Sequence, residues 1–381
     1  MKNRSTAHKK IVIDDAVPYA ESMFSPLGEV VLIPGRNITP DSVRNADALI
    51  VRSRTQVNQA LLENSAISFV GSTVVGLDHI DQAWLKQNNI HFYSAQGCNA
   101  NSVAEFVITS LLELAEDKGF DLSQKTLGII GVGHVGSLVH HKAEQLGIQC
   151  LLNDPPKVER HPEMADQYVS LDQALQADII TVHTPLTQTG KHPTHHLISA
   201  EKLQQIRPQQ ILVNAARGGI IDEQAWINTQ TLANIIDCWE NEPFINPQLY
   251  SLAYLATPHI AGHSLDAKVD GGRMVYEQLC RFWDEPITDN WQQQLPPPPE
   301  PITPPLNSSV QTRLFNTLIQ THNPRVDDRA IRDAEIENLY NKYESYRRNY
   351  PIYYEWKRHK FYKTGDKKFN NLLISLGFTP I

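Results

Sequence analysis

The stretch Thr126–Asp154 reads TLGIIGVGHVGSLVHHKAEQLGIQCLLND. An apolar run at its start leads into the glycine pattern GVGHVG (131–136), and a helical stretch then leads to a second apolar run. In such a turn the first glycine allows the tight bend, the second lets a pyrophosphate approach the backbone, and the third lets helix and strand pack closely. The N–H groups at the start of the helix face the phosphates. The stretch therefore predicts a strand–turn–helix–strand unit that binds a dinucleotide.

A carboxylate closes this unit, because Asp154 lies 18 residues after Gly136 at the end of the second apolar run. A carboxylate there accepts hydrogen bonds from a ribose diol. Lys157 and Arg160 follow and suggest NADP, but the carboxylate itself would repel a 2′-phosphate, so we predict NAD. The residues of this stretch that we expect to contact NAD are Gly131, Gly133, His134, Val135, Gly136 and Asp154.

Composition narrows the class of protein. The 381 residues are enough for two or three domains, and a hydrophobic content of 41% with 20% charged residues is typical of a globular protein. The net charge of −8 argues against nucleic-acid binding. The N-terminal residues hold no apolar stretch long enough for a signal peptide, and no segment approaches the ~18 apolar residues of a membrane helix.

The cysteine and histidine pattern predicts no metal site. Cys98, Cys150, Cys238 and Cys280 are scattered without ligand spacing, which favours free thiols in a reducing cytoplasm. The histidine pairs 140–141 and 195–196 look like metal ligands, but adjacent residues on a helix point in different directions. We therefore predict a cytoplasmic protein that needs no metal.

Strand-like apolar runs alternate with helical patterns, which indicates parallel sheets covered by helices. A strong helix is expected over Asn101–Glu116, where Ser102 and Glu105 have capping-box spacing. Another helix is expected over Leu265–Asp284. The expected strands are Ile11–Ile13, Val30–Ile33, Ala48–Val51, Ile67–Val70, Ile90–Tyr93, Leu127–Ile130, Cys150–Asn153, Ile179–Val182, Ile211–Asn214, Ile235–Cys238 and Tyr254–Ala256.

The C-terminal part of the chain has a different character. Leu295–Leu306 reads LPPPPEPITPPL and predicts a stiff extended linker that cannot be helical. Beyond it we expect two or three helices and a strand near Tyr350–Glu355. Tyrosines at spacings of three and four, from Tyr340 to Tyr350, favour a helix face that lies in the core or in an oligomer interface rather than a ligand site.

Three residues follow strand runs and therefore lie at the carboxyl edge of the sheet, where such folds bind ligands: Arg217, Glu242 and His259. A histidine can take a hydroxyl proton at neutral pH, and a neighbouring carboxylate would orient its ring and favour its cation. An arginine can hold a substrate carboxylate and polarise a developing carbonyl. Each alone could be a surface or loop residue. Their shared position favours a catalytic role, in the oxidation of a substrate alcohol that lies next to a carboxylate.

The order of motifs resembles the D-isomer-specific 2-hydroxyacid dehydrogenase family over about residues 10–290. The motifs are GVGHVG, Asp154, HTPLTQTG (183–190), NAARGGIID (214–222), DCWENEP (237–243) and PHIAG (258–262), with VRSRTQVN (51–58) and FVGSTVVGLDHID (69–81) in the first lobe. The resemblance implies that Arg217, Glu242 and His259 are catalytic. It also implies NAD contacts at Thr184, Ala215, Ala216, Arg217, Asp237 and Gly262. Substrate contacts would fall on Ser53, Val74 and His263.

Two of these substrate positions depart from the family pattern. Val74 stands where relatives commonly carry threonine, so a contact there must come from the backbone, although Thr73 beside it could compensate. His263 stands where relatives often carry tyrosine. These departures concern how the substrate phosphate is bound rather than the reaction.

The resemblance also implies an architecture: an α/β chain of two doubly wound parallel-sheet lobes, with a small α+β C-terminal dimerisation domain. The expected domains are a flavodoxin-like substrate lobe (1–96 and 265–290), a Rossmann NAD domain (97–264), a linker (291–306) and the dimerisation domain (307–381). The resemblance therefore implies a homodimer.

Within the family, the chain is most similar to members that act on a four-carbon phosphorylated 2-hydroxy acid in pyridoxal phosphate synthesis. The likeness rests on Ala95–Ala100, Leu151–Pro156, 81–84 and the tyrosine-rich tail. A phosphoglycerate dehydrogenase is the alternative, although such enzymes often end in a regulatory βαββαβ module that this tail does not resemble. A non-catalytic scaffold that senses NAD is a further alternative, against which the intact Arg–Glu–His set argues.

Overall fold

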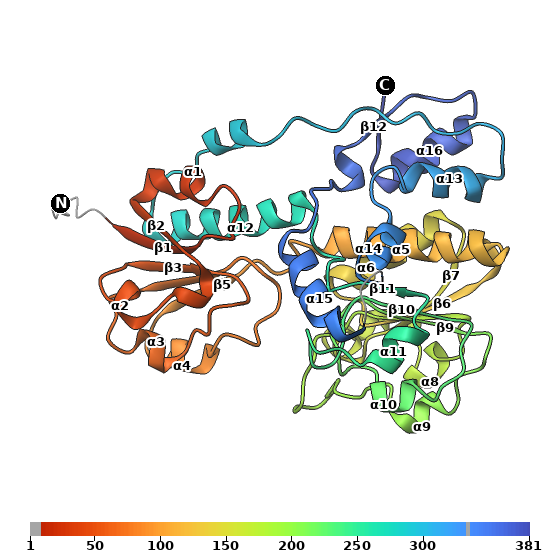
Figure 1. Ribbon diagram of the computed structural model, residues 1–381, viewed down its shortest axis with the longest axis horizontal. Helices are drawn as coiled ribbons and strands as arrows, with labels where there is room; N and C mark the ends of the chain where they lie inside the picture. The colour runs from red at the N-terminus through yellow and green to blue at the C-terminus, as the bar shows by residue number, and fades with distance from the viewer. Residues whose placement is uncertain (1–8, 333–335) are drawn as a thin grey trace. The chain divides into compact units, whose positions relative to one another are not determined.

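The chain folds into two compact units, each built on a parallel sheet (Figure 1). The computed structural model describes residues 9–332 and 336–381. The first unit holds Met1–Asn99 and Leu265–Pro297, and the second holds Ala100–Ser264 and Pro298–Ile381. Residues 1–8, in which the sequence predicts no signal peptide, lie outside the described residues. The two sheets confirm the predicted α/β class.

The first unit contains a five-stranded parallel sheet of order β2-β1-β3-β4-β5, which is the flavodoxin-like order. Alternate residues of a strand face opposite sides. Ile11 and Ile13 therefore pack in one apolar cluster with α1 and α12, while Val12 packs in another with α2, α3 and α4. The elements are β1 (Lys10–Asp14), α1 (Ala20–Phe24), β2 (Glu29–Ile33), α2 (Pro40–Val43), β3 (Ala48–Val51), α3 (Gln59–Leu62), β4 (Phe69–Ser72), α4 (Gln82–Gln87), β5 (His91–Ser94) and α12 (Leu265–Trp283).

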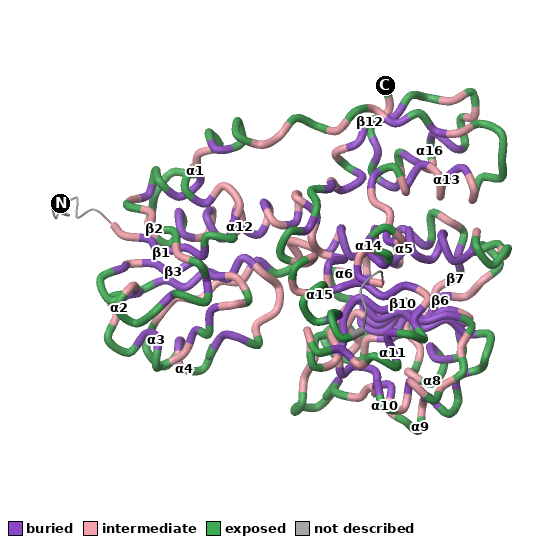
Figure 2. The backbone as a smooth tube through the Cα atoms, in the orientation of Figure 1, coloured by how far each residue is buried: buried purple, intermediate pink, exposed green. Residues whose placement is uncertain are grey.

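The second unit contains a six-stranded parallel sheet of order β11-β10-β9-β8-β6-β7. Ile129 faces a cluster with α5 and α6, and Ile130 faces a cluster with α8 to α11. Figure 2 shows this sheet as the buried centre of the unit. The strands are β6 (Thr126–Ile130), β7 (Gln149–Asn153), β8 (Ile179–Val182), β9 (Ile211–Asn214), β10 (Ala233–Ile236) and β11 (Leu255–Ala256).

The strand order of this sheet reverses at β6, because β7 pairs on one side of β6 and β8 pairs on the other. Ligands of open α/β sheets bind at the carboxyl ends of the strands beside such a reversal. The glycine turn follows β6 and therefore lies at this point. The helices that cover the sheet are α5 (Ala100–Lys118), α6 (His134–Gln145), α8 (Leu171–Ala174), α9 (Ala200–Leu203), α10 (Glu223–Trp226) and α11 (Pro247–Leu252). A further short helix, α7 (Pro155–Arg160), follows β7 and has no buried residue.

The predicted capping box at the start of α5 is wrong. The helix begins at Ala100, so Ser102 and Glu105 lie inside it. Ser102 donates to Glu355 Oε1 at 2.7 Å, and both carboxylate oxygens of Glu105 accept from the backbone N–H of Trp356 at 3.1 Å. The two polar side chains therefore bind the C-terminal segment instead of capping their own helix.

The C-terminal residues 298–381 share the apolar core of the second unit. Trp356, Phe361 and Phe369 are buried in one cluster with α5 and α6, while Leu339 and Tyr343 are buried in the cluster on the other face of the sheet. The helices are α13 (Val310–Leu318), α14 (Pro324–Arg332), α15 (Leu339–Arg348) and α16 (Lys367–Leu376), and a short parallel pair is formed by β12 (Lys360–Phe361) and β13 (Thr379–Pro380).

The strand predicted near Tyr350–Glu355 is wrong, because the chain is irregular there. Pro351 has no N–H to donate to a ladder, and the other residues of the stretch make tertiary contacts instead. Tyr350 and Tyr353 are buried in the core, and the carboxylate of Glu355 accepts hydrogen bonds from α5. Across the described residues, no helix combines the length and the apolar character needed to cross a membrane.

Candidate active site

The glycine turn has the geometry that its sequence predicts. Gly131 has a φ of 87°, which favours glycine. A Cβ at Gly136 would lie 2.0 Å from the carbonyl oxygen of Gly131, so helix and turn approach closely only because the side chain is missing. A Cβ at Gly133, in contrast, would meet no protein atom within 4 Å. The backbone at Gly133 is therefore open to the space in front of the N-terminus of α6.

Asp154 is tied to this turn. Its Oδ2 accepts from the N–H of Val132 at 2.8 Å, and its Oδ1 accepts from the N–H of Lys157 at 2.9 Å, which caps α7. The ammonium group of Lys157 donates to the Val132 carbonyl at 2.9 Å. Each carboxylate oxygen has a second lone pair for a ligand hydroxyl. The side chain of Lys157 is therefore hydrogen-bonded to the glycine turn.

Glu242 and His259 form a hydrogen-bonded pair. They follow the neighbouring strands β10 and β11, and His259 Nδ1 lies 2.8 Å from Glu242 Oε2. The other oxygen of Glu242 accepts from the N–H of Trp239 at 2.8 Å. With Glu242 accepting at Nδ1, the proton of a neutral imidazole resides there and Nε2 is a base. The side chains are 20% and 27% exposed, so the pair is neither sealed nor fully solvated.

The electrostatics of the pair favour an ionised glutamate. Burial alone would raise the pKa of Glu242, but the charge of His259 and the hydrogen bonds from His259 and Trp239 outweigh it. The pKa of Glu242 therefore lies below its ordinary value. An ionised Glu242 stabilises the imidazolium that forms when His259 takes a proton.

Asp237 organises the loop that carries His259. Its Oδ1 accepts from the Thr257 hydroxyl at 2.6 Å and from the Ile260 N–H at 2.8 Å, and its Oδ2 accepts from the Ala261 N–H at 3.0 Å. Its backbone carbonyl accepts from the N–H of His259, which has a φ of 55°. Burial raises the pKa of Asp237. The structure thus gives Asp237 a supporting role in this loop.

Arg217 lies at the same edge, after β9. Its Nη1 donates to the Ala216 carbonyl at 2.7 Å, and its own carbonyl accepts from the Asn214 side chain at 2.9 Å. Its positive charge acts on the thiol of Cys238, whose pKa burial raises well above the ordinary value. β9, β10 and β11 are neighbours in the sheet, so one edge presents Arg217, Glu242 and His259.

Cys238, Glu242 and His259 have ligand atoms within 4.8 Å of one another, which resembles a metal site. The thiol is the form of Cys238 that burial favours, whereas a metal ligand must be a thiolate. Glu242 and His259 already satisfy one another. The arrangement therefore fits an acid–base pair better than a metal centre.

The other predicted residues divide between the two units. Thr184 abuts the glycine turn, since a Cβ at Gly131 would lie 2.8 Å from its methyl group. Gly262 and His263 follow His259 on the same loop. Ser53 and Val74 lie in the first unit, just after β3 and β4.

The hydroxyl of Thr73, the neighbour of Val74, has a hydrogen-bond partner within the protein. Thr73 is buried, and its hydroxyl donates to the Val51 carbonyl at 3.3 Å. The Val74 carbonyl accepts from Ser72 and Ser94, at 3.3 and 3.1 Å.

Sequence reasoning missed the part of the C-terminal segment that reaches the loop after β11. The ring of Tyr350 meets the ring of His263 at 5.8 Å, and the Tyr353 hydroxyl donates to the Ala261 carbonyl at 3.2 Å. Arg347 Nε donates to the His259 carbonyl at 3.3 Å. The tyrosine spacing is confirmed in part: Tyr343 is buried on α15, but Tyr340 is exposed and the buried Tyr350 lies beyond the end of the helix. The spacing could not show which strand edge this segment reaches.

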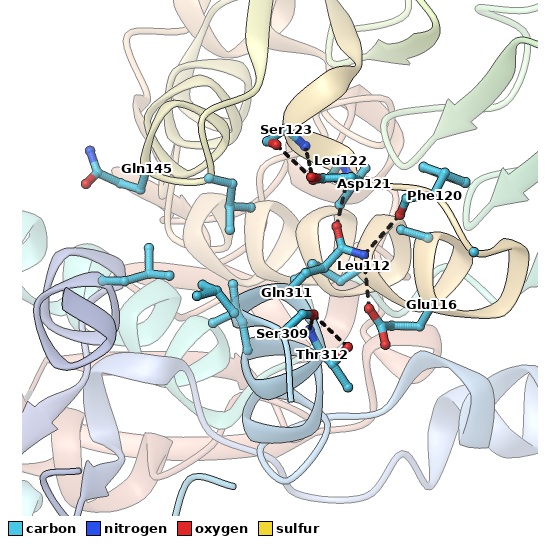
Figure 3. Close-up of a pocket in the computed structure, with 16 residues that line it drawn as sticks. Leu112, Glu116, Phe120, Asp121, Leu122, Ser123, Gln145, Ser309, Gln311 and Thr312 are labelled. Carbon is cyan, nitrogen blue, oxygen red and sulfur yellow. Dashed lines mark hydrogen bonds between the residues drawn. The ribbon is translucent and has the colours of Figure 1, made fainter. Parts of the chain in front are cut away.

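A cavity of about 560 Å³ lies elsewhere in the second unit (Figure 3). It is lined by the ends of α5 and α6 that lie far from the glycine turn and by the start of α13. Gln311 donates to Glu116 and to the Phe120 carbonyl, at 2.9 and 3.0 Å, and accepts from the Leu122 N–H at 2.9 Å. These contacts join the C-terminal segment to α5, so we interpret the cavity as part of that packing.

Comparison with known proteins gives consistent results. Residues 104–261 match the family described as D-isomer specific 2-hydroxyacid dehydrogenase, NAD binding domain. The chain is 61% identical to an erythronate-4-phosphate dehydrogenase of Hydrogenovibrio crunogenus, over 99% of this chain and 100% of that one. It is 49% identical to an erythronate-4-phosphate dehydrogenase of Ruthia magnifica, over 92% of this chain and 97% of that one.

Among solved structures, the fold is similar to that of NAD⁺-bound 3-phosphoglycerate dehydrogenase of Entamoeba histolytica. The TM-score is 0.62 at 24% identity, over 73% of this chain and 96% of that one. At this identity the likeness concerns the fold.

Proposed function

Because the chain belongs to the erythronate-4-phosphate dehydrogenases of the D-isomer-specific 2-hydroxyacid dehydrogenase family, we propose that it oxidises 4-phospho-D-erythronate to 2-oxo-3-hydroxy-4-phosphobutanoate with NAD⁺. This reaction belongs to pyridoxal 5′-phosphate synthesis. The observation that carries the proposal is the Glu242–His259 pair, at 2.8 Å, on the sheet edge that also presents Arg217 and the glycine turn.

Three residues at this edge have separate roles in the proposed reaction. Arg217 binds the C1 carboxylate and the C2 oxygen of the substrate through its guanidinium fork. His259 Nε2 takes the proton of the C2 hydroxyl, and Glu242 stabilises the resulting imidazolium. Bound NAD⁺ supplies the acceptor for the hydride that leaves C2. The C2–O bond becomes a carbonyl, and Arg217 stabilises the charge on that oxygen during the change.

The glycine turn and Asp154 have a geometry that fits NAD. A Cβ at Gly133 would enter open space before the N-terminus of α6, where the pyrophosphate would approach the backbone. The carboxylate of Asp154 lies beside the turn for the ribose. We propose that NAD is held by Gly131, Gly133, His134, Val135, Gly136, Asp154, Thr184, Ala215, Ala216, Arg217, Asp237 and Gly262. For the substrate we propose Ser53, Val74 and His263.

Initial rates of NADH formation test the substrate assignment. We expect 4-phospho-D-erythronate to give the highest kcat/KM, with 3-phosphoglycerate lower by about tenfold or more, because the shorter acid cannot place carboxylate and phosphate together. Unphosphorylated hydroxy acids should be turned over more poorly still. Better turnover of 3-phosphoglycerate would overturn the substrate while leaving the family intact. Tight NAD binding without turnover of any 2-hydroxy acid would instead favour the scaffold alternative.

We also propose a cytoplasmic homodimer that associates through residues 307–381. Large apolar side chains of this segment are exposed in the single chain, including Ile352 at 68% and Tyr362 at 52%. Such side chains are typical of an interface. Deleting the segment is a poor test, because it would also uncover the core around Trp356.

Point variants test the dimer without opening that core. Ile352→Asp should weaken association by about 2 kcal/mol, roughly thirtyfold in the dissociation constant, because an interface core excludes charge. Sedimentation over a concentration series measures this. Leu252→Asp is the control, since Leu252 is exposed on α11 outside the segment. A dimer of unchanged affinity in Ile352→Asp would place the interface elsewhere.

A further inference from the structure

The loop after β11, which carries His259, is contacted by a short stretch of the C-terminal segment. Arg347 Nε donates to the His259 carbonyl at 3.3 Å, and the Tyr353 hydroxyl donates to the Ala261 carbonyl at 3.2 Å. The same loop also donates hydrogen bonds to Asp237, from the Thr257 hydroxyl and from the N–H groups of Ile260 and Ala261. It is thus supported from the sheet by Asp237 and from the C-terminal segment by Arg347 and Tyr353.

The packing of α15 explains how Arg347 reaches this loop. Tyr343 is fully buried in the apolar cluster that also contains Trp239 and Tyr250, which flank the Glu242 loop. Arg347 lies four residues after Tyr343, so both side chains lie on the same face of the helix. The buried ring therefore fixes the helix, and the guanidinium is placed beside the catalytic loops rather than in solvent; Arg347 is half-buried.

The charge of Arg347 acts on the catalytic carboxylate. It is one of the positive charges that lower the pKa of Glu242 against the effect of burial, after His259 and the hydrogen bonds. It also acts on the buried groups beside Glu242, namely the Cys238 thiol and the Tyr343 phenol, whose pKa values burial raises. The guanidinium therefore faces the same small volume as the Glu242–His259 pair while it donates to the backbone.

We propose that Arg347 is a positioning residue for the dehydrogenase reaction, which holds the His259 loop through the His259 carbonyl and presents a positive charge to Glu242. The proposal rests on the function proposed above. It gives the C-terminal segment a role in the reaction in addition to association. It also makes the acid–base pair depend on a residue 88 positions away in the sequence.

The test compares Arg347→Met and Arg347→Lys with a matched control, Arg348→Met. Arg348 is the next residue of α15, carries the same charge and is exposed. We expect Arg347→Met to lower kcat at least about tenfold, since small displacements of a catalytic group are costly, with little change in the Kd of NAD. Arg347→Lys keeps the charge and should recover part of the rate. Arg348→Met should match the wild type.

The pH profile separates a positioning role from a purely structural one. The groups that face Glu242 are His259, Arg347, Glu223, Cys238 and Tyr343, and Asp237 also faces His259. Removing the cation of Arg347 favours the protonated forms, so the acid limb of kcat/KM should move to higher pH by roughly half a unit or more. Arg347→Lys should leave the limb in place.

Two results would overturn the proposal. One is a kcat and a pH profile of Arg347→Met equal to those of Arg348→Met. The other is a loss of thermal stability in Arg347→Met with kcat and pH profile unchanged, which would make the arginine a packing residue. Failure of the proposed function is distinguishable, because the wild type itself would then turn over no 2-hydroxy acid.

Discussion

Replacing His259 by alanine is expected to lower kcat/KM by roughly 10²- to 10⁴-fold at neutral pH, the range that general acid–base catalysis contributes. The imidazole is the group on this sheet edge that can take the C2 hydroxyl proton, and Glu242 at 2.8 Å orients it. Alanine removes the base and leaves an ionised carboxylate without its partner. Calorimetric NAD binding should be nearly unchanged, because the glycine turn follows a different strand.

His140→Ala is the matched control for this variant. His140 belongs to the same unit, lies on α6 and pairs with Glu144 at 3.3 Å. Its loss should leave the rate near that of the wild type. An unchanged rate in His259→Ala would remove His259 from its role, and the Glu242–His259 pair would then be a structural contact. A rate that recovers with added imidazole would support the role of a base.

The position of Arg217, Glu242 and His259 at one edge of the sheet was predictable because these residues obey a local rule. Glu242 and His259 are 17 positions apart, but each follows an apolar strand run, and the carboxyl ends of parallel strands meet at one edge. The conformation of the glycine turn was predictable as well, because the spacing of the glycines specifies it. These features need only local sequence and the rules of α/β sheets.

Features that depend on long-range packing were not predictable. The spacing of Ser102 and Glu105 matches a capping box, yet both side chains bind residues 355 and 356. The spacing of two polar residues shows whether they could cap a helix. It does not show whether a distant segment of the chain binds them instead. The same limit applies to Arg347, which no motif distinguishes from Arg348 beside it.

The C-terminal segment shows this limit most clearly. Its proline-rich linker and tyrosine-rich helices predict a separate part of the chain, and the family resemblance implies that this part forms a dimer. In the structure, Trp356 packs against α5 and α6, and Tyr343 packs on the opposite face of the sheet. Side chains of this segment therefore lie in the apolar cores on both faces of the NAD-binding sheet. A segment held in both cores can also support the loop after β11, to which it donates hydrogen bonds.

Two alanine substitutions in the glycine turn should separate cofactor binding from folding. Gly133→Ala should fold with a Tm close to that of the wild type, because the new Cβ meets no protein atom within 4 Å. It should weaken NAD binding by about 10- to 100-fold, since the methyl group would occupy the approach of the pyrophosphate, a cost of about 1–3 kcal/mol. Gly136→Ala, in contrast, should lower the stability of the fold itself.

In Gly136→Ala the Cβ would lie 2.0 Å from the Gly131 carbonyl, so helix and turn must separate. We expect the free energy of unfolding to fall by roughly 1–3 kcal/mol, with weaker NAD binding as a consequence. Gly365→Ala is the control, because a Cβ there also meets nothing within 4 Å and lies far along the chain. Melting curves without NAD and titrations with NAD measure both effects. Wild-type NAD affinity in Gly133→Ala would mean that the pyrophosphate does not approach this glycine, and the assignment of the turn as the NAD site would fail.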